Sequence, residues 1–383
     1  MELAEIRQEI DRIDDEMLQL FCRRMDCAGQ VAAYKAAHGM PVLNPAREQQ
    51  ILDGVRQDAG AYGDAAAVVF STVMDVSRAL QHRRLAAGGA LREALGGAQH
   101  MLFEAGQHPR IVCAGCPGAY ADEAAGLLFP DAHTPQGHLA FVESFADVVA
   151  AVREGRADYG ILPIENSSTG SVHEVYDLVM ANRCTIAAAA ELPVRHCLAA
   201  LPGADLRTLR AVYSHPQGLS QCAEYIAAHG WQPCACSNTA VAAEMVSRSG
   251  DTGIAAIASR RAAALYGLTV LEDGVQTAAN NRTRFIAISS RLVIPQDADK
   301  ISLLFSLPHV TGSLYRTLAR FAIEGLNLTK MESRPLRTGE FEYAFYLDFE
   351  GSLAQPATLD LLCALSEELP LFSFLGSYRE ISA

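Results

Sequence analysis

The chain has 383 residues, of which 50% are hydrophobic and 20% charged, and its formal net charge is -13 at pH 7. This length favours two or more domains, the apolar fraction excludes a mainly disordered protein, and the negative charge argues against generic nucleic-acid binding. The sequence has no apolar run of about 18 residues, and its N-terminus is charged at Glu2, Glu5 and Arg7, so we expect a cytoplasmic protein without a membrane span.

The 10 cysteines lie singly among apolar neighbours, which is typical of buried thiols in a reducing compartment. Cys113-x-x-Cys116 and Cys234-x-Cys236 could together supply four zinc thiolates, but the pairs are far apart and a Pro-Gly turn follows the first. The sequence contains neither a G-x-G-x-x-G motif nor a Walker lysine. We therefore expect no metal and no cofactor.

Residues 1–86 are predicted to form a helical domain. Apolar residues recur every three or four positions from Leu3 to about Tyr34, which indicates one long amphipathic helix. Asn44 as N-cap and Pro45 at the first helical position predict a second helix, and a third should cover about 64–85. Residues 87–108 are rich in glycine and are predicted to be a linker that contains one or two helical turns.

Polar and charged residues recur on these predicted helices. Arg24 and Lys35 are eleven residues apart, so they share one helix face about 16 Å apart and can serve one ligand. Arg7 precedes Arg24 by a further seventeen residues, about 25 Å, so we expect it to serve the site of a partner chain. The second and third helices add Asn44, Arg47, Glu48, Ser77 and Gln81.

This set of residues resembles the all-helical chorismate mutase family, which converts chorismate to prephenate by a pericyclic rearrangement. The resemblance implies that Arg7 and Arg24 bind the substrate carboxylates, with Arg47 and Ser77 as further binding residues. It implies that Lys35 and Gln81 donate to the ether oxygen, while Glu48 and Asn44 hold the ring hydroxyl. Asn44 stands where the bacterial family often has Asp, and it keeps a side-chain oxygen for the same role.

Residues 109–290 alternate short strands with helices, which is α/β order. Five motifs in this region resemble prephenate dehydratase: GCPGAY (115–120), PIENSSTG (163–170), SHPQ (214–217), Gln221-Cys222 and NRTRF (281–285). The resemblance implies a two-lobed fold similar to periplasmic binding proteins, with the ligand between the lobes. We expect a first lobe at 109–187 closed by 268–290, and a second lobe at 188–267.

The same resemblance implies that Thr283 is the catalytic threonine. Prephenate must lose its ring hydroxyl as water and its ring carboxylate as carbon dioxide, so one acid near the hydroxyl is sufficient. Glu165 and His215 stay open as alternative proton donors. The residues expected to bind the substrate are Asn166, Ser167, Thr169, Ser214, Gln221 and, as a possible cation, Arg284.

Residues 298–380 predict strand, helix, two strands, helix and strand, and this βαββαβ order is the ferredoxin-like motif. The motifs GSLY (312–315) and ESRP (332–335) resemble the ACT regulatory domain, which binds phenylalanine between paired domains. The binding residues implied are Gly312, Ser313, Leu314, Glu332, Ser333, Arg334 and Pro335. Inhibition by phenylalanine is the hypothesis that follows.

The three resemblances together predict a bifunctional, phenylalanine-regulated enzyme of aromatic amino acid biosynthesis that makes phenylpyruvate from chorismate. Its expected partners are chorismate, prephenate and phenylalanine, without nucleic acid or membrane, in a homodimer or homotetramer. Two alternatives stay open for the second region: arogenate as substrate, or a two-lobed small-molecule binding module without catalysis.

Overall fold

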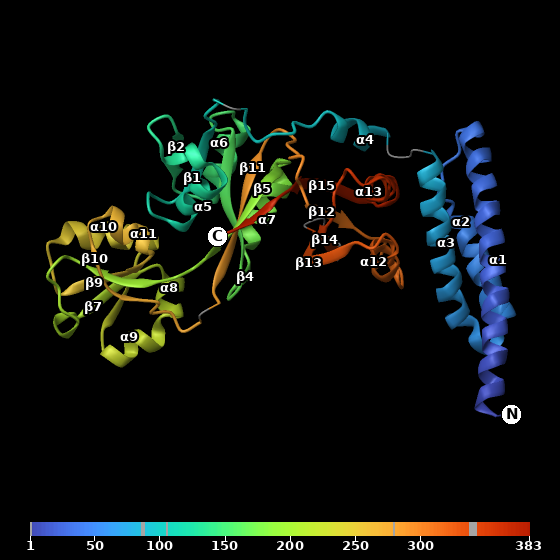
Figure 1. Ribbon diagram of the computed structural model, residues 1–383, viewed down its shortest axis with the longest axis horizontal. Helices are drawn as coiled ribbons and strands as arrows, with labels where there is room; N and C mark the ends of the chain where they lie inside the picture. The colour runs from blue at the N-terminus through green and yellow to red at the C-terminus, as the bar shows by residue number, and fades with distance from the viewer. Residues whose placement is uncertain (1, 86–88, 105, 279, 337–342) are drawn as a thin grey trace. The chain divides into compact units, whose positions relative to one another are not determined.

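The computed structural model describes residues 2–85, 89–104, 106–278, 280–336 and 343–383 (Figure 1). Contacts between residues group the chain into two compact units. One unit combines residues 1–97 with 300–374, and the other combines residues 98–299 with 375–383. The predicted helical domain and the predicted βαββαβ domain therefore belong to the same unit, although the whole α/β region separates them in sequence.

The N-terminal helices are α1 (Leu3–His38), α2 (Pro45–Asp58) and α3 (Gly63–Leu85), with a single 3-10 turn at Gly60–Tyr62. Helix α1 ends at Gly39, whose φ of 61° is left-handed and easily adopted by glycine. The predicted start of α2 is confirmed, since Asn44 Oδ1 accepts the Arg47 N–H at 3.1 Å and Pro45 is the first helical residue. Within the predicted linker, α4 (Gly89–Gly96) forms, while residues 87, 88 and 105 lie outside the described residues.

The C-terminal part of the same unit has the predicted βαββαβ order. Its sheet runs in the order β13-β14-β12-β15, and its core includes Phe305, Phe321, Leu347 and Phe349. Residues 337–342, between the two middle strands of the predicted order, lie outside the described residues. The elements are β12 (Lys300–Ser306), α12 (Ser313–Ile323), β13 (Asn327–Pro335), β14 (Tyr343–Glu350), α13 (Pro356–Glu368) and β15 (Leu371–Tyr378).

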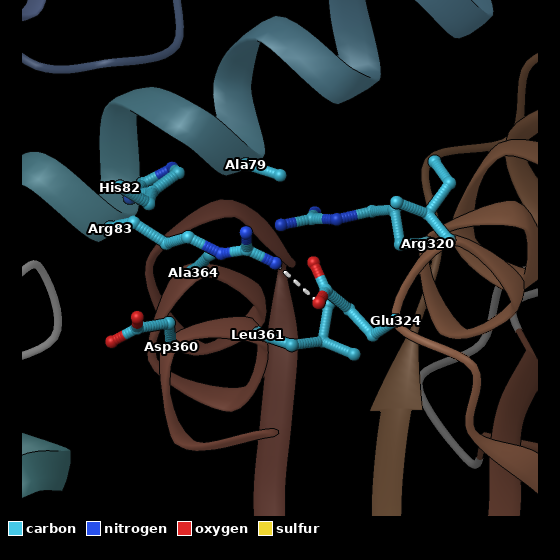
Figure 2. A pocket seen from close by; sticks show the side chains of 9 residues that line it. Ala79, His82, Arg83, Arg320, Glu324, Asp360, Leu361 and Ala364 are labelled. Atoms are coloured by element: carbon cyan, nitrogen blue, oxygen red, sulfur yellow. Dashed lines mark hydrogen bonds and ion pairs between the residues drawn. The ribbon is translucent and has the colours of Figure 1, made fainter. Parts of the chain in front are cut away.

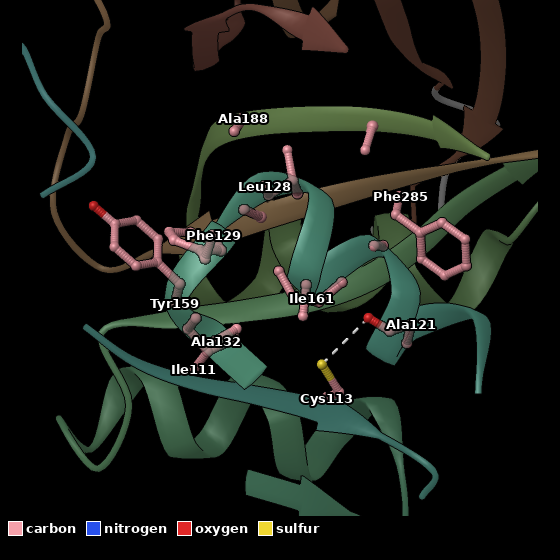
Figure 3. Packing of buried hydrophobic residues seen from close by; sticks show 14 of the residues in the cluster. Ile111, Cys113, Ala121, Leu128, Phe129, Ala132, Tyr159, Ile161, Ala188 and Phe285 are labelled. Carbon is pink, nitrogen blue, oxygen red and sulfur yellow. Dashed lines mark hydrogen bonds between the residues drawn. The ribbon is translucent and has the colours of Figure 1, made fainter. Parts of the chain in front are cut away.

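The first lobe of the second unit is a mixed sheet in the order β16-β5-β11-β3-β1-β2, with β4 paired to β3. Helix α5 packs on this sheet, and Phe129, Ile161 and Phe285 belong to the buried cluster that Figure 3 shows. Its strands are β1 (Arg110–Ala114), β2 (His138–Val142), β3 (Tyr159–Asn166), β4 (Gly170–Ser171), β5 (Thr185–Pro193), β11 (Arg282–Ser289) and β16 (Glu380–Ser382). Its helices are α5 (Tyr120–Leu128), α6 (Phe145–Arg153) and α7 (His173–Asn182), with a 3-10 turn at Pro130–His133.

The second lobe is a sheet in the order β10-β6-β9-β7-β8. Its strands are β6 (Cys197–Ala200), β7 (Ala211–Ser214), β8 (Gln232–Ala235), β9 (Ile254–Ala258) and β10 (Thr269–Asp273). Its helices are α8 (Pro216–Gln221), α9 (Ala223–His229), α10 (Thr239–Ser249) and α11 (Arg260–Leu265), with a 3-10 turn at Leu206–Thr208.

The predicted boundary between the lobes was wrong at both ends. Strand β10 pairs antiparallel with β6, so residues 269–273 complete the second lobe and do not return to the first. Strand β5 pairs with β11 as far as Pro193, so the first lobe extends beyond residue 187. The reason is that sheet membership depends on pairing between distant strands, which local apolar patterns do not encode.

Candidate active sites

Both lobes line a cavity of about 760 Å³, a size that suits a small-molecule ligand. The first lobe contributes the turn between β1 and α5, the end of β3 and the start of β11, while the second contributes the starts of α8 and α10. In the turn between β1 and α5, Gly115 and Gly118 have φ values of 107° and 87°, which favour glycine. A Cβ at Gly118 would also meet the backbone of Ala262 at 3.1 Å. Gly115 therefore lines the cavity, while Gly118 allows the same turn to pack closely against α11.

Asn166 organises the polar side of this cavity. Its Nδ2 donates to Asn281 Oδ1 at 2.8 Å, to Thr283 Oγ1 at 2.9 Å and to the Arg282 carbonyl at 3.1 Å. Its Oδ1 accepts the Ser168 hydroxyl at 2.6 Å and the Thr169 backbone N–H at 3.1 Å. One buried amide thus fixes the loop after β3 against the start of β11.

Thr283 is 9% exposed and lines the cavity. Its hydroxyl oxygen accepts a hydrogen bond from Asn166, and among the described residues no acceptor for its own proton lies within hydrogen-bonding distance. A hydroxyl group has one donor and two acceptor positions. The Thr283 proton is therefore available to a molecule in the cavity.

An anion in this cavity would be attracted by helix N-termini and not by basic side chains. Its lining, among the described residues, includes no Arg or Lys. Burial lowers the pKa of His215, and burial also lowers the pKa of His196 although its hydrogen bond with Gln221 opposes this. Both imidazoles are therefore neutral at pH 7. Helices α5 and α10 begin at the cavity, and helix N-termini attract anions.

The structure brings together only part of the predicted dehydratase set. Asn166, Thr169, Gln221 and Thr283 line the cavity, as does His215. Three predicted binding residues, Ser167, Ser214 and Arg284, and the alternative acid Glu165 are not among the lining residues of this cavity.

The corrections for these residues have simple physical causes. The Ser214 hydroxyl is fully buried and donates to the Ile257 carbonyl at 2.6 Å, while Ser167 Oγ donates to the Asn280 carbonyl at 3.0 Å. Arg284 follows Thr283 on β11, and successive side chains of a strand point to opposite faces. Its guanidinium pairs with Glu165 at 3.2 Å and also with Glu380.

Sequence reasoning missed several polar residues of the cavity, among them Gln217, His196 and Glu143. Gln217 Nε2 donates to Thr169 Oγ1 at 3.2 Å, and His196 Nε2 lies 2.8 Å from Gln221 Oε1. Gln217 stood within the SHPQ motif, which was available as a signal. His196 belongs to no motif. It lies in the segment between β5 and β6, where the chain passes from the first lobe to the second.

The predicted mutase residues lie on the three N-terminal helices, with Asn44 as the N-cap of α2. Lys35 Nζ donates to the Val42 carbonyl at 2.5 Å, and burial lowers the pKa of Lys35 while the nearby Glu48 carboxylate opposes that shift. Arg24 Nη1 lies 3.5 Å from the Val73 carbonyl on α3. Helices α1, α2 and α3 therefore present cations and a carboxylate to one region.

Ser77 and Gln81 on α3 are each 7% exposed, and Gln81 Nε2 lies 3.4 Å from Ser77 Oγ. Gln81 Oε1 is buried without a hydrogen-bond partner in the described structure. Arg7 and Arg47 are exposed, and Arg47 Nη1 donates to Gln50 at 2.7 Å. In the described chain the side chains of these two arginines make no hydrogen bond to the other predicted mutase side chains, although the backbone N–H of Arg47 donates to Asn44 Oδ1.

Sequence reasoning also missed Arg78, which is buried beside Ser77 and binds Glu48 through Nη1 at 2.6 and 2.5 Å. The available signal was the pair Asp75 and Arg78, one helical turn apart on the helix that holds Ser77 and Gln81. A single arginine on a helix is normally solvated, so the signal was weak.

The predicted phenylalanine-binding residues lie on two elements of the C-terminal domain. Gly312 has a φ of 80° and is the N-cap of α12, while Ser313 Oγ donates to the Pro308 and Val310 carbonyls at 2.7 and 2.6 Å. Leu314 follows in the first turn of α12. The other four, Glu332, Ser333, Arg334 and Pro335, end strand β13.

Within the part of the chain that the structure describes, no three His, Cys, Asp or Glu side chains are grouped as a metal site. Cys113 is fully buried, and its thiol donates to the Ala121 carbonyl at 3.5 Å (Figure 3). Burial raises the pKa of Cys113 and of Cys116. Among the described helices, none is both long and apolar enough to cross a lipid bilayer.

Two protein families match this chain. The family model described as prephenate dehydratase matches residues 111–292, and the model described as chorismate mutase type II matches residues 6–82. An arogenate dehydratase/prephenate dehydratase of Arabidopsis thaliana is 39% identical over 285 residues, which cover 70% of this chain and 71% of that protein. The fold and the matches define an enzyme with a helical mutase-type domain and a two-lobed dehydratase domain. The chain belongs to the prephenate dehydratase family and also contains a chorismate mutase type II domain.

Two solved structures support the same fold. Prephenate dehydratase from Arthrobacter aurescens in complex with L-Phe is 28% identical, with a TM-score of 0.63, over 70% of this chain and 89% of that one. A structure described as a novel type of quorum quenching acylase is 33% identical, with a TM-score of 0.62, over 70% of this chain and 97% of that one.

Proposed function

We propose that the chain converts chorismate to prephenate in its helical domain and prephenate to phenylpyruvate in its two-lobed domain. The observation that carries the second step is the hydroxyl of Thr283, which is buried in the cavity, oriented by Asn166 and has its proton unused. Prephenate would lose its ring hydroxyl as water while its ring carboxylate leaves as carbon dioxide. Thr283 donates its proton to the departing hydroxyl so that water leaves, Asn166 holds the threonine as a donor, and the threonine hydroxyl regains its proton from solvent, so that the reaction consumes one proton overall.

The neutral histidines support this choice of acid. An imidazole with a lowered pKa carries no proton to give at neutral pH, which disfavours His215 as the donor. Glu165 pairs with Arg284 and is not among the cavity residues. Thr283 therefore is the candidate that combines position with an available proton.

For the mutase step, the helices supply groups that fold chorismate and stabilise charge on its ether oxygen. We assign Lys35 and Gln81 as donors to that oxygen, because preorganised donors act on charge that develops in the transition state. Gln81 Nε2 has two hydrogens and makes one long contact, 3.4 Å to Ser77 Oγ, so this amide has a hydrogen left to donate to a ligand. Arg24 and Arg47 would bind carboxylates, while Asn44, Glu48 and Ser77 would fix the rest of the substrate.

A second copy of the chain is part of this proposal. Helix α1 exposes apolar side chains at alternating spacings of three and four, from Leu3, Ile6 and Ile10 to Ile13, Met17 and Leu20, each at least 39% exposed. Such a stripe normally packs against another helix. Pairing would bring Arg7 to the site of the other copy. Chains with Arg7→Ala and chains with Arg24→Ala, refolded together, should recover part of the mutase activity through one intact mixed site, and no recovery would contradict the shared site.

Regulation by phenylalanine is proposed for the C-terminal domain as an ACT domain. The turn at Gly312 and the end of β13 provide the predicted binding residues, and the similar Arthrobacter aurescens structure contains L-Phe. We propose that phenylalanine inhibits the dehydratase through this domain. Unchanged rates at saturating phenylalanine would contradict the regulation without affecting the catalytic assignment. The cytoplasmic location stays a prediction.

Arogenate is the second candidate substrate of the two-lobed domain. The similar Arabidopsis protein is named for both arogenate and prephenate. Arogenate differs by an ammonium in place of the keto group, and Glu143 is a carboxylate that lines the cavity. Dehydration of arogenate would give phenylalanine directly, so the two substrates are distinguished by their products.

The deciding experiment supplies the full chain with chorismate alone and follows phenylpyruvate by its absorbance in alkali. We expect phenylpyruvate from the wild type, none above background from Thr283→Ala, and partial activity from Thr283→Ser, which retains the hydroxyl. Prephenate that accumulates without phenylpyruvate would restrict the proposal to the mutase. A parallel assay with arogenate would then separate an arogenate enzyme from a binding module without catalysis.

A further inference from the structure

A cluster of buried charged side chains joins helix α3 to the C-terminal domain. The Arg78 guanidinium binds both oxygens of Glu48 through Nη1 and pairs with Asp75 through Nη2. Its Nε lies 3.8 Å from Oε2 of Glu368, the last residue of α13. One guanidinium, with its side chain 10% exposed, is thus surrounded by carboxylates from α2, α3 and α13.

Glu368 is itself held from two further directions. His82 Nε2 lies 2.6 Å from its Oε1, and Arg320 Nη1 donates to its Oε2 at 2.8 Å. Burial raises the pKa of Glu368, but the hydrogen bond from His82 and the guanidiniums of Arg320 and Arg78 outweigh burial and lower the pKa to about 2. Glu368 is therefore a charged, fixed partner for Arg78 at neutral pH.

A second ion pair joins α3 to the C-terminal domain next to this cluster, in a small pocket that His82 and Arg320 also line. Arg83 pairs with Glu324 at the end of α12, beside Ala79 and Leu361 (Figure 2). The Arg83 side chain is 41% exposed, and it contacts neither Glu48 nor Arg78 in the described structure. This pair offers a matched control, because it links the same parts of the chain and differs in having no contact with a mutase residue.

We infer that Arg78 and Glu368 are positioning residues for the mutase reaction: Arg78 orients Glu48, and Glu368 of the C-terminal domain fixes Arg78. The inference rests on the proposed mutase function, in which Glu48 accepts a hydrogen bond from the ring hydroxyl. A free carboxylate would rotate and would repel a substrate with two carboxylates. Arg78 restrains both Glu48 oxygens and offsets their charge. The C-terminal domain thereby contributes to the support of the mutase site.

The test compares the full chain with Glu368→Gln and with Glu324→Gln as the control. We expect Glu368→Gln to lower mutase kcat by about two- to thirtyfold, the range of coupling through packed networks, with KM changed less than twofold. Glu324→Gln should keep kcat within twofold, and both variants should retain wild-type dehydratase activity with prephenate. Glu368→Asp, which keeps the charge, should restore part of the lost kcat.

A double-mutant cycle then separates positioning from general loosening. If Glu368 acts through Arg78, Glu368→Gln should have little further effect on kcat in an Arg78→Gln chain, because the effects of coupled residues are not additive. Equal mutase kcat in Glu368→Gln and in the control Glu324→Gln would overturn the inference. So would a double variant Arg78→Gln/Glu368→Gln whose loss of kcat is the product of the two single losses. A wild-type chain that makes no prephenate from chorismate would instead refute the proposed mutase function itself.

Discussion

The replacement Asn166→Asp tests the dehydratase site most directly, because it changes chemistry with almost no change in shape. The wild-type amide donates two hydrogens to three acceptors: Asn281 Oδ1, the Arg282 carbonyl and Thr283 Oγ1. A carboxylate has no hydrogen to give, and this site is 6% exposed. It would also accept the Thr283 hydroxyl proton, which the proposed reaction needs.

The magnitude follows from these contacts. Three lost hydrogen bonds at about 1 kcal/mol each amount to about 3 kcal/mol of stability, or roughly 6–12 °C in the melting temperature of a domain of this size. Loss of a positioned acid lowers kcat by about 100-fold or more. The assay follows phenylpyruvate formed from prephenate below the melting temperature of the variant.

The mutase domain of the same chain provides the internal control. Chorismate consumption should keep its wild-type rate in Asn166→Asp, which shows that the mutase domain is intact and the protein correctly quantified, and a thermal unfolding curve shows that the two-lobed domain is folded at the assay temperature. A variant with wild-type dehydratase kcat would refute the reasoning, because it would show that the reaction does not depend on the Thr283 proton being directed into the cavity.

Three further predictions concern other parts of the molecule. Lys35→Ala should lower mutase kcat/KM by about 100-fold or more, measured by chorismate absorbance, and a smaller loss would contradict its contact with the ether oxygen. Glu143→Gln should lower kcat/KM for arogenate by about two- to fivefold, the effect of losing an exposed ion pair, and should not lower kcat/KM for prephenate. Equal effects on both substrates would contradict a role of Glu143 in binding the arogenate ammonium group. Because the pKa of Glu368 is about 2 in the folded chain and its ordinary value is 4.5, its stabilisation is present above pH 4.5 and is lost as the pH falls from 4.5 to 2. The free energy of unfolding of Glu368→Gln should therefore decrease less between pH 4.5 and pH 2 than that of the wild type. Identical pH dependence in the two chains would contradict this stabilising role of the Glu368 carboxylate.

The sequence predicted features that depend on local chemistry. Asn44 caps α2 because a side-chain oxygen before a helix satisfies its first N–H groups, and such signals need no knowledge of the rest of the chain. The βαββαβ order was predicted for the same reason. The pairing of β10 with β6 was not, because both candidate sheets offer apolar partners and only the fold decides between them.

The errors in the site have two different origins. Arg284 could have been excluded from the sequence, since it neighbours Thr283 on a strand and must face the other way. Arg78 could not have been assigned, because its role depends on Glu368, which packing brings to it from the far end of the chain. Motifs therefore indicated Thr283 and Asn166, which line the cavity while their roles stay predictions, whereas long-range packing determines which residues surround each site.

The absence of Arg and Lys from the described lining of the two-lobed cavity fits the proposed chemistry. The ring carboxylate of prephenate must lose its negative charge as it leaves as carbon dioxide. A guanidinium bound to that carboxylate would stabilise the ground state more than the transition state and would slow the reaction. Helix N-termini and neutral donors bind the same anion with less opposition to its departure. In the mutase reaction both carboxylates persist unchanged, so cations such as Arg24 bind substrate and transition state alike and carry no such cost. On the proposed functions, the two domains would bind related dianions with different electrostatics because only one of the two reactions removes a charge.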